Sequence, residues 1–118
     1  MNKVILIGRL TKDPECNTFS DGRMVANFTL AVDRPFTNKE GDKQADFVSI
    51  VLWEKTAELV KKYTKKGHQL AVSGRIQTRT YTNSDGEKKY TTEVIGEQIQ
   101  FLTNKNQSQD IDDVGVPY

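Results

Sequence analysis

The chain has 118 residues, of which 36% are hydrophobic and 28% charged, a balance typical of one small globular domain. Its single cysteine, Cys16, and single histidine, His68, exclude an internal disulfide and argue against a zinc finger or a Cys/His hydrolase. No apolar run approaches the roughly 18 residues of a membrane span, and no signal-peptide pattern follows Met1, so we expect an intracellular protein.

The net charge of +1 is divided unevenly along the chain. Residues 103–118 hold Lys105 against three aspartates, a net charge of −2, so residues 1–102 carry +3. The same final stretch is rich in Asn, Gln, Ser and Asp and has almost nothing to bury. We therefore expect a mildly basic domain over residues 1–102 and a flexible acidic tail over residues 103–118.

Two segments near the start have strand patterns. Residues 2–10 contain the branched run Val4–Ile7, which predicts a strand buried on both faces. After a turn at residues 21–22, residues 24–33 alternate apolar and polar side chains. This alternation predicts a half-buried strand with Phe28 in the core.

The middle of the chain predicts a loop and a third strand. Residues 34–46 are polar and contain a proline and a glycine, which predicts a hairpin loop long enough to be functional. Residues 47–53 then alternate again. Phe47 and Trp53 fall on the face of this strand opposite the core.

The remaining segments predict one helix and one hairpin. Residues 54–66 carry apolar side chains at helical spacing and end before Gly67, a common helix stop. Residues 69–81 alternate, and a turn at residues 83–86 returns the chain along residues 88–95. Three strands, a helix and two strands form the order of a five-stranded Greek-key barrel of the oligonucleotide-binding (OB) type, with the helix between strands 3 and 4.

No catalytic constellation is evident. The chain has no P-loop, no G-x-S-x-G and no H-E-x-x-H motif. Asp110, Asp112 and Asp113 are clustered, but a flexible tail cannot hold carboxylates in the geometry that acid–base chemistry needs. We expect a protein that is not an enzyme and that uses no cofactor and no metal.

Aromatic and basic side chains instead gather on the strand faces opposite the core. The third strand places Phe47 and Trp53 there, the fourth places Arg75, Arg79 and Tyr81, and the predicted loop adds Arg34 and Phe36. Rings flanked by cations suit single-stranded nucleic acid, because unpaired bases stack on rings while cations neutralise phosphates.

Several of these residues also have a purely structural interpretation. Trp53 ends a strand and could pack beneath the following helix, and Phe47 could fill a subunit interface. The lysines between residues 61 and 66 complement the helix dipole even without a ligand. Tyr81, which is followed by a turn, is the ring least expected to be buried.

At this point the chain resembles the bacterial and phage single-stranded DNA-binding proteins. The matching segments, in order, are NKVILIGRL at 2–10 with Asp13-Pro14, VANFTLA at 25–31, KKG at 65–67, GRIQTR at 74–79 and YTTEV at 90–94. The resemblance implies an OB fold and a homotetramer that wraps single-stranded DNA, without strong sequence preference, in replication, recombination and repair. It also implies a location in the cytoplasm, at a bacterial nucleoid or in a phage-infected host.

The resemblance also assigns site residues. It implies stacking of bases on Phe36, Phe47, Trp53 and Tyr81, and DNA contacts by Lys55 and Lys66. Arg34, Arg75 and Arg79 join them on the pattern of charges alone.

The end of the chain resembles the family's tail in part. Family members finish in an acidic tip ending Asp-Ile-Pro-Phe, through which they recruit repair and replication enzymes. Here the acidic residues, proline and aromatic keep their order, with tyrosine in the last place. The resemblance implies partner binding by Asp110, Asp112, Asp113, Pro117 and Tyr118; a tail that only aids solubility is the alternative.

Three other functions stay open on the sequence. A nuclease on the same barrel would need fixed carboxylates and a divalent metal. A primosomal-type adaptor would act mainly through protein contacts, and an RNA-binding OB module of the cold-shock type would prefer RNA.

Overall fold

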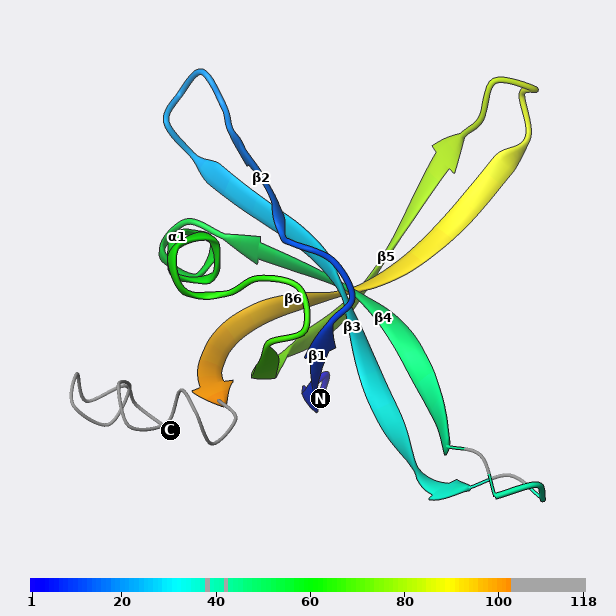
Figure 1. Ribbon diagram of the computed structural model, residues 1–118. Coiled ribbons are helices and arrows are strands. Elements are labelled where there is room, and N and C mark those ends of the chain that lie inside the picture. Colours follow the sequence, from blue (N-terminus) through cyan, green and yellow to red (C-terminus); the bar gives the residue numbers. More distant parts are fainter. Residues whose placement is uncertain (38, 42, 103–118) are drawn as a thin grey trace.

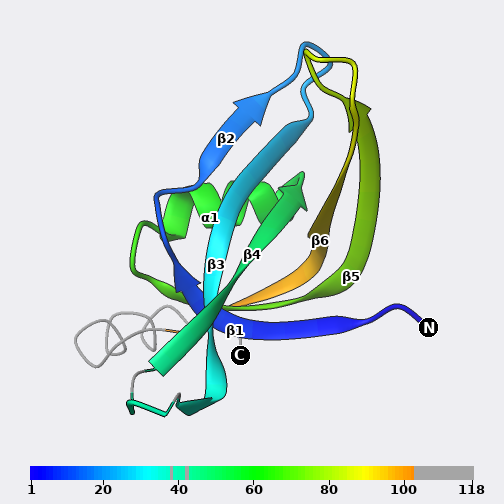
Figure 2. The ribbon, with the colours of Figure 1, turned by 90° about the vertical axis from the view of Figure 1, so that its right-hand side faces the viewer.

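The computed structural model describes residues 1–37, 39–41 and 43–102, which form six strands, one helix and the segments that connect them. In chain order they are β1 (Val4–Leu10), β2 (Glu15–Thr18), β3 (Met24–Thr37), β4 (Lys43–Trp53), α1 (Lys55–Tyr63), β5 (Gln69–Thr82) and β6 (Lys88–Leu102). Figures 1 and 2 show the β2–β3 and β5–β6 hairpins rising to the same end of the molecule, where Figure 1 shows them apart, while the β3–β4 hairpin projects to the opposite end.

Five of the strands close a barrel. β1 pairs with β5, β5 with β6, β6 with β4 and β4 with β3, and β3 returns to β1 at Leu30 and Ala31. The β4–β6 pair is parallel, with Ile50 opposite Val94. Helix α1 connects β4 to β5, the third and fourth strands of this barrel, so the predicted OB barrel is confirmed. Within the described ranges, no helix has the length and apolar character that crossing a membrane requires.

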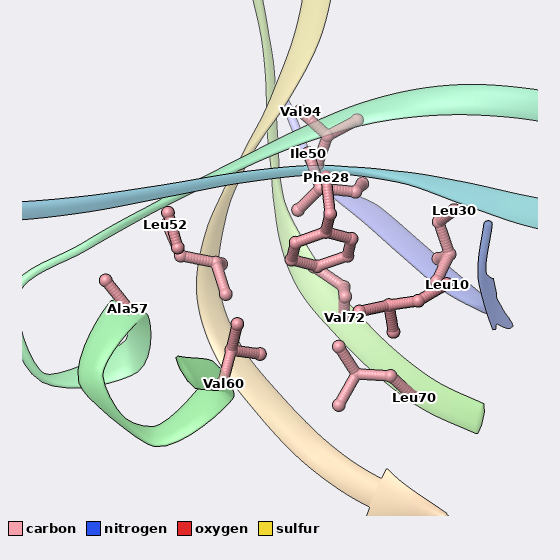
Figure 3. Packing of buried hydrophobic residues seen from close by; sticks show 11 residues of the cluster. Leu10, Phe28, Leu30, Ile50, Leu52, Ala57, Val60, Leu70, Val72 and Val94 are labelled. Atoms are coloured by element: carbon pink, nitrogen blue, oxygen red, sulfur yellow. The ribbon is translucent and has the colours of Figure 1, made fainter. Parts of the chain in front are cut away.

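The core lies inside the barrel and beneath α1 (Figure 3). The helix contributes Ala57 and Val60, and β3 contributes Phe28, which is buried as predicted. The largest fully buried side chains are Leu10, Leu30, Ile50, Leu52, Leu70, Val60 and Val72. Burying each is worth about 1.5–3 kcal/mol, so a one-residue slip that turned a strand's apolar set outward would be costly.

The sequence prediction missed one strand and made one loop too long. The strand β2 was not predicted, and the predicted loop over residues 34–46 is too long, since β3 continues to Thr37 and β4 begins at Lys43, opposite it. The hairpin formed by these two strands projects beyond the barrel, so its side chains need no apolar alternation. β2 is short and polar, and it is held by pairing with β3 rather than by a hydrophobic face of its own.

The prediction that β1 is buried on both faces is also wrong. Leu10 lies in the core, but Ile5 and Ile7 are exposed on the outer side of the barrel. β5 pairs with one edge of β1 from Val4 onward, whereas β3 reaches the other edge at Arg9 and Leu10. Among the described residues, therefore, the second edge of β1 has no strand partner before Arg9.

A β-bulge marks the point where the β5–β6 hairpin leaves the barrel. The pairing register shifts between Ser73 and Gly74, which inserts Glu97 as an extra residue in β6. A Cβ at Gly74 would collide with the carbonyl oxygen of Ile95, so a side chain does not fit there. Beyond the bulge β5 loses its pairing with β1, which ends at Val4 opposite Gly74, and Ile76, predicted to face inward, is exposed although its partner Val94 on β6 lies in the core.

Substituting Gly74 by alanine tests this close approach. The Cβ meets backbone rather than a flexible side chain, so the two strands must separate, and we expect Gly74→Ala to lower the free energy of unfolding by about 1–3 kcal/mol. Urea unfolding at fixed protein concentration measures the change. Ser73→Ala, the neighbouring control, should change it by less than about 0.5 kcal/mol; equal stability of the two variants would contradict the tight contact.

Candidate nucleic-acid interface

Pairing across the sheet brings the predicted residues of β4 and β5 onto one side. Val51 of β4 pairs with Ile95 of β6, and Ile95 pairs with Arg75 of β5. Paired residues point to the same side of a sheet, and side chains alternate along each strand. That side carries the set we call the aromatic face, which consists of Phe47, Trp53, Arg75, Arg79 and Tyr81.

The three rings of the aromatic face are open to solvent. Phe47 is 69% exposed, Tyr81 is 51% exposed and Trp53 is 36% exposed. Phe47 and Trp53 are six residues apart on β4, about 20 Å at the usual rise of a strand. Tyr81 lies close to the tip of the β5–β6 hairpin, opposite Lys89. The rings therefore mark a path across β4 and along the hairpin rather than a single pocket.

A groove of about 350 Å³ is lined by the β1–β2 connection and the start of β2, by β3 and β4, and by the β5–β6 hairpin. Its lining includes Arg79 but none of the three rings. Two cationic residues are outnumbered there by three acidic ones, and the uncharged polar lining residues are Thr11, Asn27, Thr29, Ser49 and Thr91. This balance does not favour phosphate, whereas amides and hydroxyls can donate to and accept from the edges of bases.

Arg79 is held on the aromatic face by a buried carboxylate. Glu93, only 7% exposed, accepts a hydrogen bond from Arg79 Nε at 2.9 Å and a second from the Gln77 amide at 3.3 Å. The Arg79 side chain itself stays more than half exposed. Arg79 therefore reaches the surface as half of an ion pair with a fixed direction, not as an isolated cation.

The other two predicted arginines are also paired. Arg34 lies in β3 rather than in a loop, and its Nε and Nη2 donate to Asp46 Oδ1 at 3.1 and 2.9 Å while Nη1 donates to Gln44 at 2.9 Å. Hydrogen bonding to Asp46 raises the pKa of Arg34. Arg75 is held more loosely, with Nε 4.0 Å from a carboxylate oxygen of Glu97.

The remaining predicted residues are placed only in part. Lys55 opens α1 and Lys66 follows it, and both are exposed. The backbone N–H of Lys66 donates to Asp13 Oδ1 at 2.8 Å, which puts Lys66 beside the groove.

Phe36 belongs to β3 by its backbone, and its side chain is outside the described part. The predicted partner-binding residues Asp110, Asp112, Asp113, Pro117 and Tyr118 lie outside the described residues.

Sequence reasoning missed two side chains beside Trp53. The rings of Phe19 and Trp53 stack with centroids 5.8 Å apart and planes at 22°. The guanidinium carbon of Arg23 lies 5.6 Å from the Phe19 centroid and 5.5 Å from the Trp53 centroid. The only signal in the sequence was an aromatic and an arginine on either side of the turn at residues 21–22, and nothing there linked them to Trp53. Trp53 thus packs on the β2–β3 hairpin.

The lone thiol and the acidic groups offer little chemistry. Burial raises the pKa of Cys16, an effect that nearby Lys61 opposes, so the thiol stays protonated at neutral pH. Among the residues that the structure describes, no three His, Cys, Asp or Glu side chains converge as metal ligands would.

Comparison with known proteins shows what the chain is similar to. The profile of the single-strand binding protein family matches residues 1–102. The single-stranded DNA-binding protein of Halalkalibacterium halodurans is 52% identical over 110 residues, which are 92% of this chain and 66% of that protein. Single-stranded DNA-binding protein 1 of Staphylococcus aureus is 53% identical over 106 residues, 90% of this chain and 68% of that protein.

A solved structure agrees with these relatives. The Plasmodium falciparum SSB complex with ssDNA matches this fold with a TM-score of 0.77 and 28% sequence identity. The match covers 86% of this chain and 95% of that one.

Removing the Arg79 charge tests the role of its buried partner. Arg79→Met keeps the aliphatic stem but leaves the Glu93 carboxylate with only the Gln77 amide, so we expect the free energy of unfolding to fall by about 1–3 kcal/mol. Urea unfolding measures it. In the double variant Arg79→Met/Glu93→Gln, a neutral amide replaces the carboxylate and should restore most of the loss; a double variant no more stable than the single one would contradict this pairing.

Proposed function

The chain belongs to the single-strand binding protein family, and from this premise we propose that it coats single-stranded DNA, without strong sequence preference, during replication, recombination and repair. One observation carries the proposal: three exposed rings share a face with Arg75 and Arg79. Each stacked base contributes about 1–3 kcal/mol, and stacking tolerates any sequence because every base has a π-face.

The path of the strand follows from the charges along the groove. Bases lie against Phe47, Trp53 and Tyr81, and their polar edges meet the amide and hydroxyl side chains of the groove. Phosphates stay at the rim, near Lys55, Lys66 and the arginines, because the groove itself holds more carboxylates than cations. The role is one of binding, and stacking and phosphate neutralisation supply its affinity without a catalytic group.

We propose that the chain assembles as a homotetramer. The support is β1, whose outer side exposes Ile5 and Ile7 beside an edge that no described strand covers before Arg9. An uncovered apolar edge favours pairing with another strand, and the same edge of a second copy offers an identical surface. Two such pairs make four copies, each presenting one aromatic face.

We also propose that the two parts of the chain have different functions. Residues 1–102 bind DNA, and residues 103–118 serve as an acidic tail. Its end docks on replication or repair proteins through Asp110, Asp112, Asp113, Pro117 and Tyr118, because acidic side chains, a ring and a terminal carboxylate suit a basic, apolar pocket. Such work places the protein where unpaired DNA occurs, in a bacterial nucleoid or in the cytoplasm of a phage-infected host.

Removing two rings tests the stacking model. We expect the double variant Trp53→Ala/Tyr81→Ala to bind labelled oligo-dT more weakly by at least about 2 kcal/mol, or roughly thirtyfold in Kd, and to stay folded because neither side chain belongs to the core. Fluorescence anisotropy measures Kd, and Tyr63→Ala, an exposed ring on α1, is the control. Unchanged affinity in a folded double variant would rule the model out, and tighter binding of an RNA of equal length would favour the RNA-binding alternative.

A charge placed on β1 tests the assembly. Ile7→Lys puts a cation on the surface that a second copy would cover, so we expect the tetramer to break into smaller species. Native mass spectrometry gives the mass, and Ser84→Lys adds the same charge to a turn as a control. A wild-type chain that is not tetrameric, or an Ile7→Lys variant with the wild-type mass, would refute this arrangement.

A further inference from the structure

Phe19, Arg23 and Trp53, which we call the hairpin cluster, are in mutual contact where the β2–β3 hairpin meets the end of β4. The three distances between the two ring centroids and the guanidinium carbon are 5.5, 5.6 and 5.8 Å, so the three centres form a nearly equilateral triangle. No member lies between the other two, because a sandwich would make one of these distances about twice the others. Neither ring is sandwiched by the other two members, and Phe19 remains 44% exposed.

The backbone on both sides of the hairpin cluster is held in place. The Phe19 N–H donates to the Arg23 carbonyl at 2.7 Å, and the Gly22 N–H donates back to the Phe19 carbonyl at 2.9 Å. On the other side, the Thr56 hydroxyl donates to the Trp53 carbonyl at 2.8 Å. A platform that is already ordered loses little conformational entropy when a ligand stacks on it.

Asp21 orients the guanidinium of Arg23, but the ion pair between them is weak. Its Nε lies 2.9 Å from Asp21 Oδ2, and both side chains are more than half exposed. The Arg23 backbone N–H, and then its guanidinium, lower the pKa of Asp21, so the carboxylate is ionised at neutral pH. An exposed pair of this kind is worth little, whereas a guanidinium can bind a phosphate through two parallel hydrogen bonds.

The hairpin cluster is continuous with the aromatic face because Trp53 belongs to both. Trp53 pairs with Val25 of β3, six residues beyond Phe19, and the Glu54 N–H donates to the Met24 carbonyl at 2.8 Å. The line from Phe47 to Trp53 along β4 therefore continues onto Phe19. The β2–β3 hairpin rises to the same end of the barrel as the β5–β6 hairpin that carries Tyr81 (Figures 1 and 2).

We propose that the hairpin cluster is an additional nucleotide subsite, in which a base stacks on the open side of Phe19 and the adjoining phosphate pairs with Arg23. The inference rests on the proposed function, since it extends the same bound strand by one position. Phe19 acts here through direct contact with DNA. A ring that merely braced Trp53 would instead affect every bound strand alike.

Trp53 is the single tryptophan of the chain, so quenching of its fluorescence reports a base stacked against it. The experiment titrates the full-length protein with oligo-dT of increasing length, over about 4 to 16 nucleotides. Phe19→Leu keeps an apolar side chain against Trp53 but removes the ring face. Phe19→Tyr restores the face, and Tyr63→Leu removes an exposed ring that stands against Phe101, away from the hairpin cluster, as the matched control.

We expect Phe19→Leu to bind the longer oligonucleotides roughly five- to a hundredfold more weakly, while the shortest ones that still quench Trp53 bind as they do to the wild type. Phe19→Tyr should return the affinity for long strands, and Tyr63→Leu should leave it unchanged. Arg23→Gln keeps both rings but removes the charge, and gives an independent test: it should reduce the slope of log K against log salt by about 0.7.

Three results would overturn the subsite. Equal affinity of Phe19→Leu and the wild type at every length removes it, as does an unchanged salt slope in Arg23→Gln. A loss in Phe19→Leu that is the same for short and long strands shows that Phe19 only supports Trp53. In each of these cases the wild type still binds and the proposed function stands, whereas a wild-type chain that neither quenches nor binds oligo-dT refutes the proposed function itself.

Discussion

Closure of the barrel is the constraint on which the rest of this structure depends. Because β3 returns to β1 and completes the ring, one side of each barrel strand is committed to a shared apolar core. Alternation then directs the other side chains outward, and on β4 these include the exposed Phe47 and Trp53. The packing that stabilises the domain and the rings proposed to bind DNA are thus two consequences of one register.

Outside the barrel, the hairpins are organised by polar contacts instead of a core. Arg34 spans the β3–β4 hairpin to Asp46, and Arg79 spans the β5–β6 hairpin to Glu93. These pairs fix where each guanidinium points while leaving much of it at the surface. A domain whose formal charge over residues 1–102 is only +3 can in this way still present cations along a defined path.

The barrel was predictable because alternation of apolar residues reports burial directly. The pattern around Phe28 and the order of strands and helix led to the correct fold, with α1 in its correct place. What lies outside the core was predicted poorly for the same reason. β2 is mostly exposed, with only Cys16 half-buried against the core, so its sequence carries no clear period. The exposed Ile5 and Ile7 were indistinguishable from core residues in an apolar run.

The candidate site was predictable in part. The alternation of side chains along each strand was enough to place Phe47, Trp53 and Tyr81 on the outer face, since the buried residues of the same strands fix which side faces the core. Phe19 and Arg23 could not be assigned, because their meeting with Trp53 depends on how a hairpin folds over β4, which is a tertiary contact without a local signal. The buried partner of Arg79 was missed for the same reason.

The most direct measurement is a crystal structure of the full chain bound to oligo-dT. We expect thymine rings stacked on Phe47, Trp53 and Tyr81, with the sugar–phosphate backbone following Arg75 and Arg79 outside the barrel. A strand bound elsewhere, with these three rings left in contact with solvent, would contradict it.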